Sequence, residues 1–103
     1  MNRKKIILQQ DEHVLSILTG LLEIFDGTQN VYFGELYLTN KRIYVVSNRL
    51  INVEESSFWF EGENRDIEHS TLIVGEHRIA VRYAYNGNLP YFIKTFQNLN
   101  VNV

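Results

Sequence analysis

The stretch GELYLTNKRIYVVS, residues 34–47, decides the fold of this 103-residue chain. Two runs rich in β-branched and aromatic residues, VYFGELYLT (residues 31–39) and RIYVVS (residues 42–47), flank the polar pair Asn40-Lys41. Such runs are typical of strands, and asparagine tolerates the positive φ that a two-residue turn requires. The stretch therefore predicts a β-hairpin.

The rest of the chain adds further strand signals. Residues 71–74 and residues 78–85 (RIAVRYAY) are rich in β-forming residues, and the second segment alternates with a period of two. The alternation places three apolar side chains on one face of that strand: Ile79, Val81 and Tyr83. Asn86-Gly87 is the strongest short turn signal in the chain, and residues 91–96 are the predicted partner strand.

Residues 14–25 (VLSILTGLLEIF) fit two structures. Their apolar residues fall at positions 14, 17, 18, 21, 22 and 25, which is helical spacing, and Asp11 would cap such a helix. Gly20, the β-branched content and the hairpin-like sequence FDGTQNVYF (residues 25–33) favour a strand. We therefore predict a long strand bent at Gly20 and keep the helix as the alternative.

Composition limits the class of protein. The chain has 45% apolar residues, 13% aromatic residues and no cysteine, which predicts one domain over residues 1–103 without disulfides or thiolate metal sites. A net charge of -2 supplies no overall basic field for nucleic acid or anionic lipid. The start MNRKKIILQQDEH is too short for a signal-peptide core, so we expect a cytoplasmic protein, with any mobile start confined to residues 1–6.

Residues 34–43 resemble a hairpin of known proteins. Their G-x-L-x-L-T-N-K-R-hydrophobic pattern is similar to the second and third strands of GRAM and bacterial PH-like domains. Residues 11–15 (DEHVL), 66–72 (DIEHSTL) and 91–98 (YFIKTFQN) are similar to other strands of these families, in the same order. The resemblance covers roughly residues 11–98 and implies a mostly β, PH/GRAM-like antiparallel barrel of about seven strands.

Two differences from these families affect the predictions. The families end in a helix that plugs one mouth of the barrel, whereas NLNVNV (residues 98–103) alternates like a strand. We therefore expect the terminal helix to be reduced or absent.

The phosphoinositide-binding members of these families use a basic loop between the first two strands. Here the corresponding DGTQN (residues 26–30) has no positive charge, so phosphoinositide membrane binding is not expected.

The adjacent cations Lys41 and Arg42 have two interpretations. They would keep the hairpin tip in water and block edge pairing, in which case replacing both by alanine would change stability by less than ~1 kcal/mol. In the alternative, anions or nucleic acid are bound by four cations: Lys41, Arg42, Arg78 and Arg82. Basic residues beside exposed tyrosines are typical of proteins that bind single strands, so a small RNA-binding regulator is the alternative function.

SFWFEG (residues 57–62) predicts a contact surface. On a strand Phe58 and Phe60 share one face and Trp59 takes the other, so one apolar face would point away from a single barrel interior. We predict self-association through these aromatic residues and the alternating tail: Phe58, Trp59, Phe60, Leu99, Val101 and Val103.

No pattern in the sequence indicates catalysis or a cofactor. Neighbours on a strand point to opposite faces, so the Glu-His pairs at 12–13, 68–69 and 76–77 are expected to be surface residues rather than metal ligands. Six acidic residues lie between positions 54 and 68, either as a solvated surface or as a docking surface for a basic partner. We predict a non-catalytic interaction module that acts as a homo-oligomer and binds an unidentified protein partner.

Overall fold

The computed structural model describes residues 7–25, 27–48 and 53–101. These contain the following elements: β1 (Val14–Phe25), β2 (Gln29–Thr39), β3 (Arg42–Asn48), β4 (Val53–Trp59), β5 (Arg65–Glu68), β6 (Thr71–Val74), β7 (His77–Asn86) and α1 (Leu89–Val101). The strands form one antiparallel sheet in the order β4-β3-β2-β1-β7-β6-β5. Among the described residues no strand pairing joins β4 to β5, so the sheet is strongly curved but not closed.

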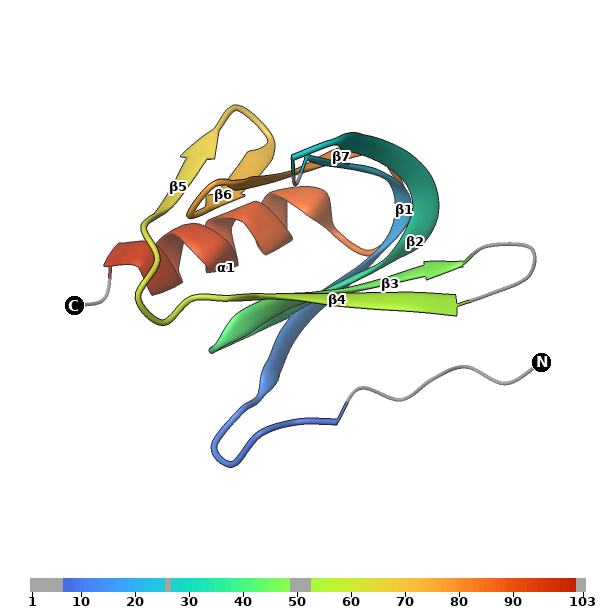
Figure 1. Cartoon of the computed structure of the whole chain (residues 1–103). Coiled ribbons are helices and arrows are strands. Elements are labelled where there is room, and N and C mark those ends of the chain that lie inside the picture. The colour runs from blue at the N-terminus through green and yellow to red at the C-terminus, as the bar shows by residue number, and fades with distance from the viewer. Residues whose placement is uncertain (1–6, 26, 49–52, 102–103) are drawn as a thin grey trace.

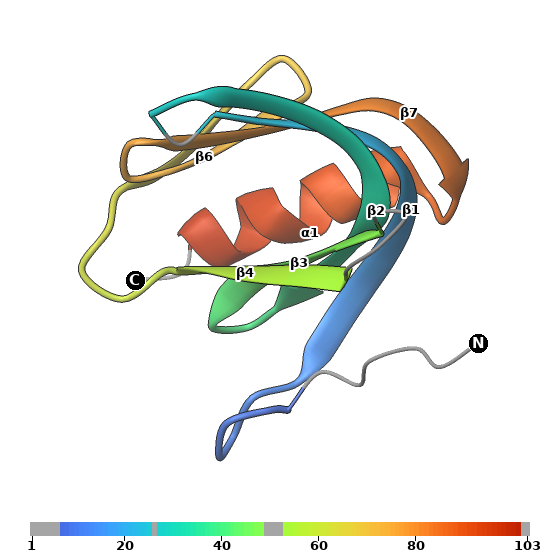
Figure 2. The same cartoon turned by 45° about the vertical axis from the view of Figure 1, so that its right-hand side comes forward.

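The central hairpin and the long first strand are confirmed. β2 and β3 pair from Gly34 opposite Ser47 to Leu38 opposite Ile43, and residues 14–25 form one strand rather than a helix. Gly20 lies opposite Gly34 on β2. A Cβ atom at Gly20 would lie 2.0 Å from the carbonyl oxygen of Tyr83, so only glycine allows this close approach. β1 and β2 bend together around the interior (Figure 2).

The predicted last strand at residues 91–96 is wrong, because this segment lies in α1. The side-chain oxygen of Asn88 accepts a hydrogen bond from the backbone N–H of Tyr91 at 3.0 Å, which caps the first turn of the helix. Apolar side chains then recur with helical spacing on one face: Leu89, Phe92, Ile93, Phe96 and Leu99. The terminal helix is therefore present and runs for 13 residues, contrary to the expectation of a reduced or absent helix.

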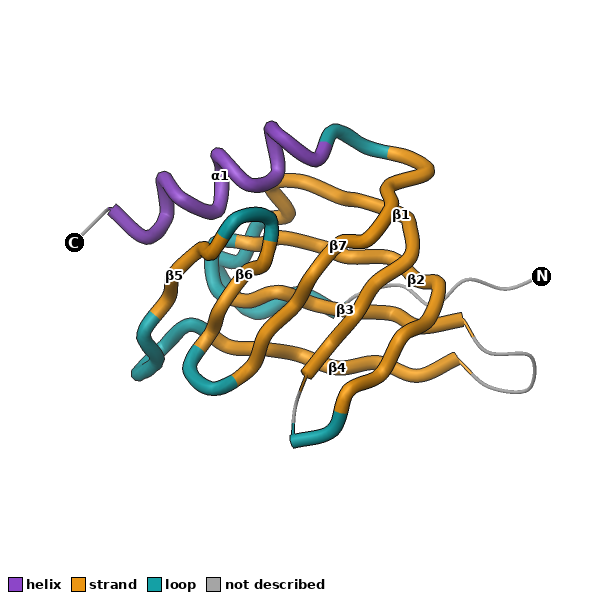
Figure 3. The backbone as a smooth tube through the Cα atoms, turned by 90° about the horizontal axis from the view of Figure 1, so that it is seen from above, coloured by secondary structure: helices purple, strands orange, loops and turns teal. Residues whose placement is uncertain are grey.

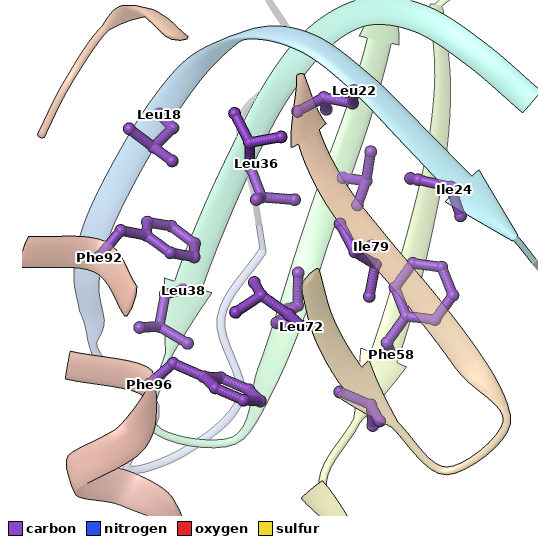
Figure 4. Packing of buried hydrophobic residues seen from close by; sticks show 14 of the residues in the cluster. Leu18, Leu22, Ile24, Leu36, Leu38, Phe58, Leu72, Ile79, Phe92 and Phe96 are labelled. Carbon is purple, nitrogen blue, oxygen red and sulfur yellow. The ribbon is translucent and has the colours of Figure 1, made fainter. Parts of the chain in front are cut away.

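The helix fills the concave side of the sheet. α1 lies between β5–β7 on one side and β3–β4 on the other (Figure 1), and seen from above it runs along one margin of the strands (Figure 3). Phe92 and Phe96 are fully buried, and they approach Leu18 and Leu38 in the core (Figure 4). Burial of two aromatic rings contributes several kcal/mol to folding, at about 1.5–3 kcal/mol for each large apolar side chain.

A bulge in β7 changes which of its residues face the core. Leu21 pairs with Tyr83 whereas Leu22 pairs with Val81, so Arg82 is an extra residue opposite β1. The extra residue reverses the alternation beyond it. Val81 is 7% exposed, but Tyr83 and Tyr85 are 59% and 57% exposed. The expectation that Tyr83 shares a face with Val81 is therefore wrong.

Candidate interaction surface

The hairpin turn is the centre of a buried polar network, which we call the polar corner and define as Glu12, Thr39, Asn40 and Arg42. Glu12 is 4% exposed and Arg42 is 6% exposed. Nε of Arg42 donates to Oε2 of Glu12 at 2.8 Å. The hydroxyl of Thr39 donates to the same carboxylate oxygen at 2.7 Å and accepts from the backbone N–H of Arg42 at 2.9 Å. Two segments 30 residues apart are thereby joined.

The neighbouring asparagine extends this connection through its side chain. Oδ1 of Asn40 accepts from the backbone N–H of His13 at 2.6 Å, and Nδ2 donates to the carbonyl oxygen of Asp11 at 2.9 Å. Asp11 adopts a φ of 63°, a left-handed conformation that aspartate tolerates better than most residues. The polar corner therefore holds the chain entering β1 against the β2–β3 turn.

The environment of Glu12 favours its charged form. Burial by itself raises the pKa of Glu12, but hydrogen bonds from Arg42, the backbone of Gln9 and Thr39, together with the attraction of the guanidinium, hold that pKa below its ordinary value of 4.5. Glu12 is therefore a buried carboxylate. The expectation that it is a surface residue is wrong, and so is the expectation that Arg42 keeps the hairpin tip in water.

Arg42 also explains the position of Trp59. The guanidinium carbon of Arg42 lies 4.4 Å from the centre of the Trp59 ring and 4.9 Å from that of Tyr44. Nη1 of Arg42 donates to the hydroxyl of Ser57 at 2.8 Å, and Nη2 to the carbonyl oxygen of Ile7 at 2.8 Å. With these partners and so little exposure, the Arg42 guanidinium is a structural group rather than a contact for an external anion.

The residues proposed for self-association are separated by the fold. Phe58 and Phe60 belong to the core at 6% exposure each, whereas Trp59 is 39% exposed. Leu99 packs against the core from α1. Val101 is the last residue of α1, so the tail up to this point is helical rather than an edge-pairing strand. Val103 lies outside the described residues.

An open groove of about 740 Å³ lies next to the polar corner. It is lined by residues of the N-terminal segment, the β2–β3 turn, the end of β4, the β4–β5 loop and the start of β5: Gln9, Asn40, Lys41, Trp59, Phe60, Glu61, Gly62, Glu63, Asn64 and Arg65. Lys41 is partly exposed here. Two cations and two carboxylates share the lining, so its charge favours neither an anionic nor a cationic ligand.

The outer side of β2, β1 and β7 carries an exposed apolar surface, which we call the aromatic face. It comprises the half-buried Leu21 and five exposed residues: Ile17, Val31, Phe33, Tyr83 and Tyr85. Phe33 and Tyr85 stack across β1 with ring centres 5.5 Å apart, and Tyr83 meets Tyr85 edge-on at 4.9 Å. Phe33 is 51% exposed in spite of this contact.

Two of the four cations predicted to bind anions lie beside the aromatic face. Arg82 follows Val81 in the bulge, and its Nη1 contacts Oε1 of Glu23 at 2.7 Å. Arg78 contacts Glu68 at 3.1 Å and lines a smaller groove of about 270 Å³ that also includes Glu23. The structure therefore groups Arg78 and Arg82 on β7, whereas Lys41 and Arg42 lie at the β2–β3 turn.

Sequence reasoning missed the aromatic face. The alternation in residues 29–39 places Val31 and Phe33 on one side of β2, which was readable from the sequence. The outward turn of Tyr83 and Tyr85 depends on the bulge, and no residue type in RIAVRYAY marks that position.

The remaining described residues include the candidate ligands of a metal centre. Within the part of the chain that the structure describes, no three histidine, cysteine, aspartate or glutamate side chains come together as a group able to hold a metal ion. His13, Glu68 and His69 are exposed, as expected for surface residues. Among the described residues no helix has the length and apolar character needed to cross a membrane.

No protein-family model and no curated protein matches the chain.

Proposed function

We propose that this chain is a non-catalytic cytoplasmic interaction module that binds its partner through the aromatic face. The observation that carries the proposal is the contact of Phe33, Tyr83 and Tyr85 on the outside of the sheet, each more than half exposed. Exposed apolar patches of this kind mark binding surfaces more often than do scattered apolar residues. Tyrosine and phenylalanine are also enriched at the centres of protein interfaces.

The ring contacts of the aromatic face support the same proposal. Phe33 and Tyr85 come from the two strands that flank β1, so their stacking favours one arrangement of the two rings before a partner arrives. A preorganised surface loses less side-chain entropy when it binds. Edge-to-face and stacked ring contacts contribute about 0.5–1.5 kcal/mol each beyond burial, enough to hold such an arrangement.

Membership of the PH/GRAM-like class is part of the proposal. The antiparallel order of seven strands followed by one C-terminal helix supports it, as does the T-N-K-R hairpin. The polar corner gives that hairpin pattern a structural role. We do not expect phosphoinositide binding, because Gly27 and Thr28 between β1 and β2 supply no cation.

Capture from native cells with matched variants tests the proposal. The wild-type chain, Phe33→Ser, Tyr85→Ser and the control Tyr91→Ser would each serve as bait. Tyr91 is 56% exposed but lies on α1 rather than on the aromatic face, so it controls for loss of an exposed aromatic ring. We expect the two aromatic-face variants to lose a partner that Tyr91→Ser keeps. Equal capture by all four baits contradicts the proposal.

A small RNA-binding regulator is the second candidate. It is favoured by the position of Arg78 and Arg82 on the same strand as Tyr83 and Tyr85, since aromatic rings beside cations can stack bases and contact phosphates. Fluorescence anisotropy with single-stranded RNA tests it. Binding that weakens steeply with salt and is lost in Tyr83→Ser would favour RNA. Absence of binding at low salt would exclude it.

A further inference from the structure

We infer that the aromatic face binds a second copy of this chain, with the same six residues on both sides of a two-fold axis. The inference rests on the proposed function, because it names the partner of the same surface. A two-fold interface uses one patch twice, so the patch must be self-complementary in size, charge and shape. The aromatic face meets the first two requirements, and its position on a sheet addresses the third.

The exposed apolar area is close to what one stable interface needs. Phe33, Tyr83 and Tyr85 are 51%, 59% and 57% exposed. Since an aromatic side chain buries about 150–250 Å², covering these three removes roughly 300 Å² from water. Ile17 and Val31, 47% and 52% exposed, bring the total to roughly 400 Å². A standard interface covers about 800 Å² per partner, a little over half of it apolar.

The charges beside the aromatic face are balanced. Arg82 is paired with Glu23 at 2.7 Å, and Arg78 is paired with Glu68 at 3.1 Å. Two copies can therefore approach without like-charge repulsion, whereas a nucleic acid strand gains much of its affinity from cations that neutralise phosphates. The balance favours a second copy over RNA as the occupant.

The position of the aromatic face on a sheet also suits a symmetric contact. Its residues come from three adjacent strands, β2, β1 and β7, and not from a loop. Two sheets pack face to face about 10 Å apart when their apolar side chains interdigitate. Phe33 and Tyr85 come from the strands on either side of β1 and meet with ring centres 5.5 Å apart, so they form one apolar ridge that can pack against the same ridge of a second copy.

Sedimentation equilibrium of the full chain, over micromolar to millimolar concentrations, tests the inference. We expect the wild-type chain to reach twice its mass of 12.1 kDa. Phe33→Ser and Tyr85→Ser should each raise the dimer dissociation constant by at least about tenfold, the effect of removing an interface anchor. Tyr91→Ser should dimerise like the wild type. Thermal melts of each variant would show that weaker association does not come from unfolding.

The outcomes separate this inference from the proposed function. A wild-type chain that stays monomeric at millimolar concentration overturns the inference, and so does a dimer unaffected by Phe33→Ser and Tyr85→Ser. If a monomeric chain binds another protein or RNA, and the same two variants lose that binding, the aromatic face is an interaction surface and only its occupant is wrong. If both variants match the wild type in every binding assay, the proposed function fails as well.

Discussion

The polar corner and the aromatic face lie on the same outer side of the sheet, and each reverses the usual relation between side-chain chemistry and burial. Glu12 and Arg42 are charged and almost fully buried, whereas Tyr83 and Tyr85 are aromatic and more than half exposed. In the polar corner each buried charge has hydrogen-bonded partners. In the aromatic face the rings of Phe33, Tyr83 and Tyr85 contact one another and are still more than half exposed. The aromatic face therefore exposes apolar side chains that a partner could cover, whereas the charges of the polar corner already have partners. This makes the aromatic face the better candidate for binding.

The largest expected effect is on the free energy of unfolding, when the buried ion pair of Glu12 and Arg42 is removed. Arg42→Ala should lower the free energy of unfolding by about 3–5 kcal/mol, because it leaves the Glu12 carboxylate buried without its cation. Lys41→Ala, one residue away and partly exposed, should change it by less than ~0.5 kcal/mol. Urea unfolding of the two variants measures both values. Equal effects would mean that the polar corner is no more important to stability than an exposed turn.

Gly20→Ala should have the next largest effect and should also alter the aromatic face. Its Cβ atom would lie 2.0 Å from the carbonyl oxygen of Tyr83, so β1 and β7 must separate there. Forced overpacking of this kind costs about 1–3 kcal/mol. Thermal unfolding measures the stability. Near-ultraviolet circular dichroism would report whether the contact between Tyr83 and Tyr85 changes, and an unchanged spectrum with unchanged stability would contradict the prediction.

Acid should weaken the polar corner selectively. The pKa of Glu12 is lower in the folded chain than its ordinary value of 4.5. The carboxylate therefore stabilises the fold above pH 4.5, and this contribution disappears as the pH falls through the lower pKa of the folded state. The stability difference between the wild type and Glu12→Gln should be largest near neutral pH and shrink below pH 4.5.

Urea unfolding at a series of pH values measures that difference. Glu68→Gln is the matched control, since the Glu68 side chain is 66% exposed and its pair with Arg78 contributes little. We expect this control to follow the wild-type profile. A difference for Glu12→Gln that stays constant down to the acid-unfolded region would show that the carboxylate is not a charged stabilising group.

Trp59→Ala should have a smaller effect than Arg42→Ala or Gly20→Ala, and it should affect stability rather than assembly. The indole covers the Arg42 guanidinium at 4.4 Å, and such a contact contributes about 0.5–2 kcal/mol. If the aromatic face is the contact surface, sedimentation of Trp59→Ala should match that of the wild type. Loss of the dimer in Trp59→Ala, with the dimer retained in Phe33→Ser, would move the interface to the polar corner.

Local sequence signals were reliable where neighbouring residues decide the structure. The β2–β3 hairpin follows from two β-rich runs and one Asn-Lys turn, and it was predicted within a residue or two. Residues 91–96 were misassigned because FIKTF fits both a strand and a helix. The Asn88 cap and the spacing of Phe92 and Phe96 were the available signals for the helix. The candidate site was largely missed, since only the position of Arg78 and Arg82 on one strand was anticipated.

The sequence by itself determined that the chain is mostly β and where its central hairpin turns, and it favoured a strand over a helix for residues 14–25. These features depend on residue types that are adjacent or alternate along the chain. Only the tertiary structure decided that Arg42 is buried against Glu12, 30 residues earlier, and that Tyr83 and Tyr85 face outward. The first depends on contact between distant segments, and the second on an extra residue in the pairing of β7 with β1. Neither leaves a periodic pattern in the sequence.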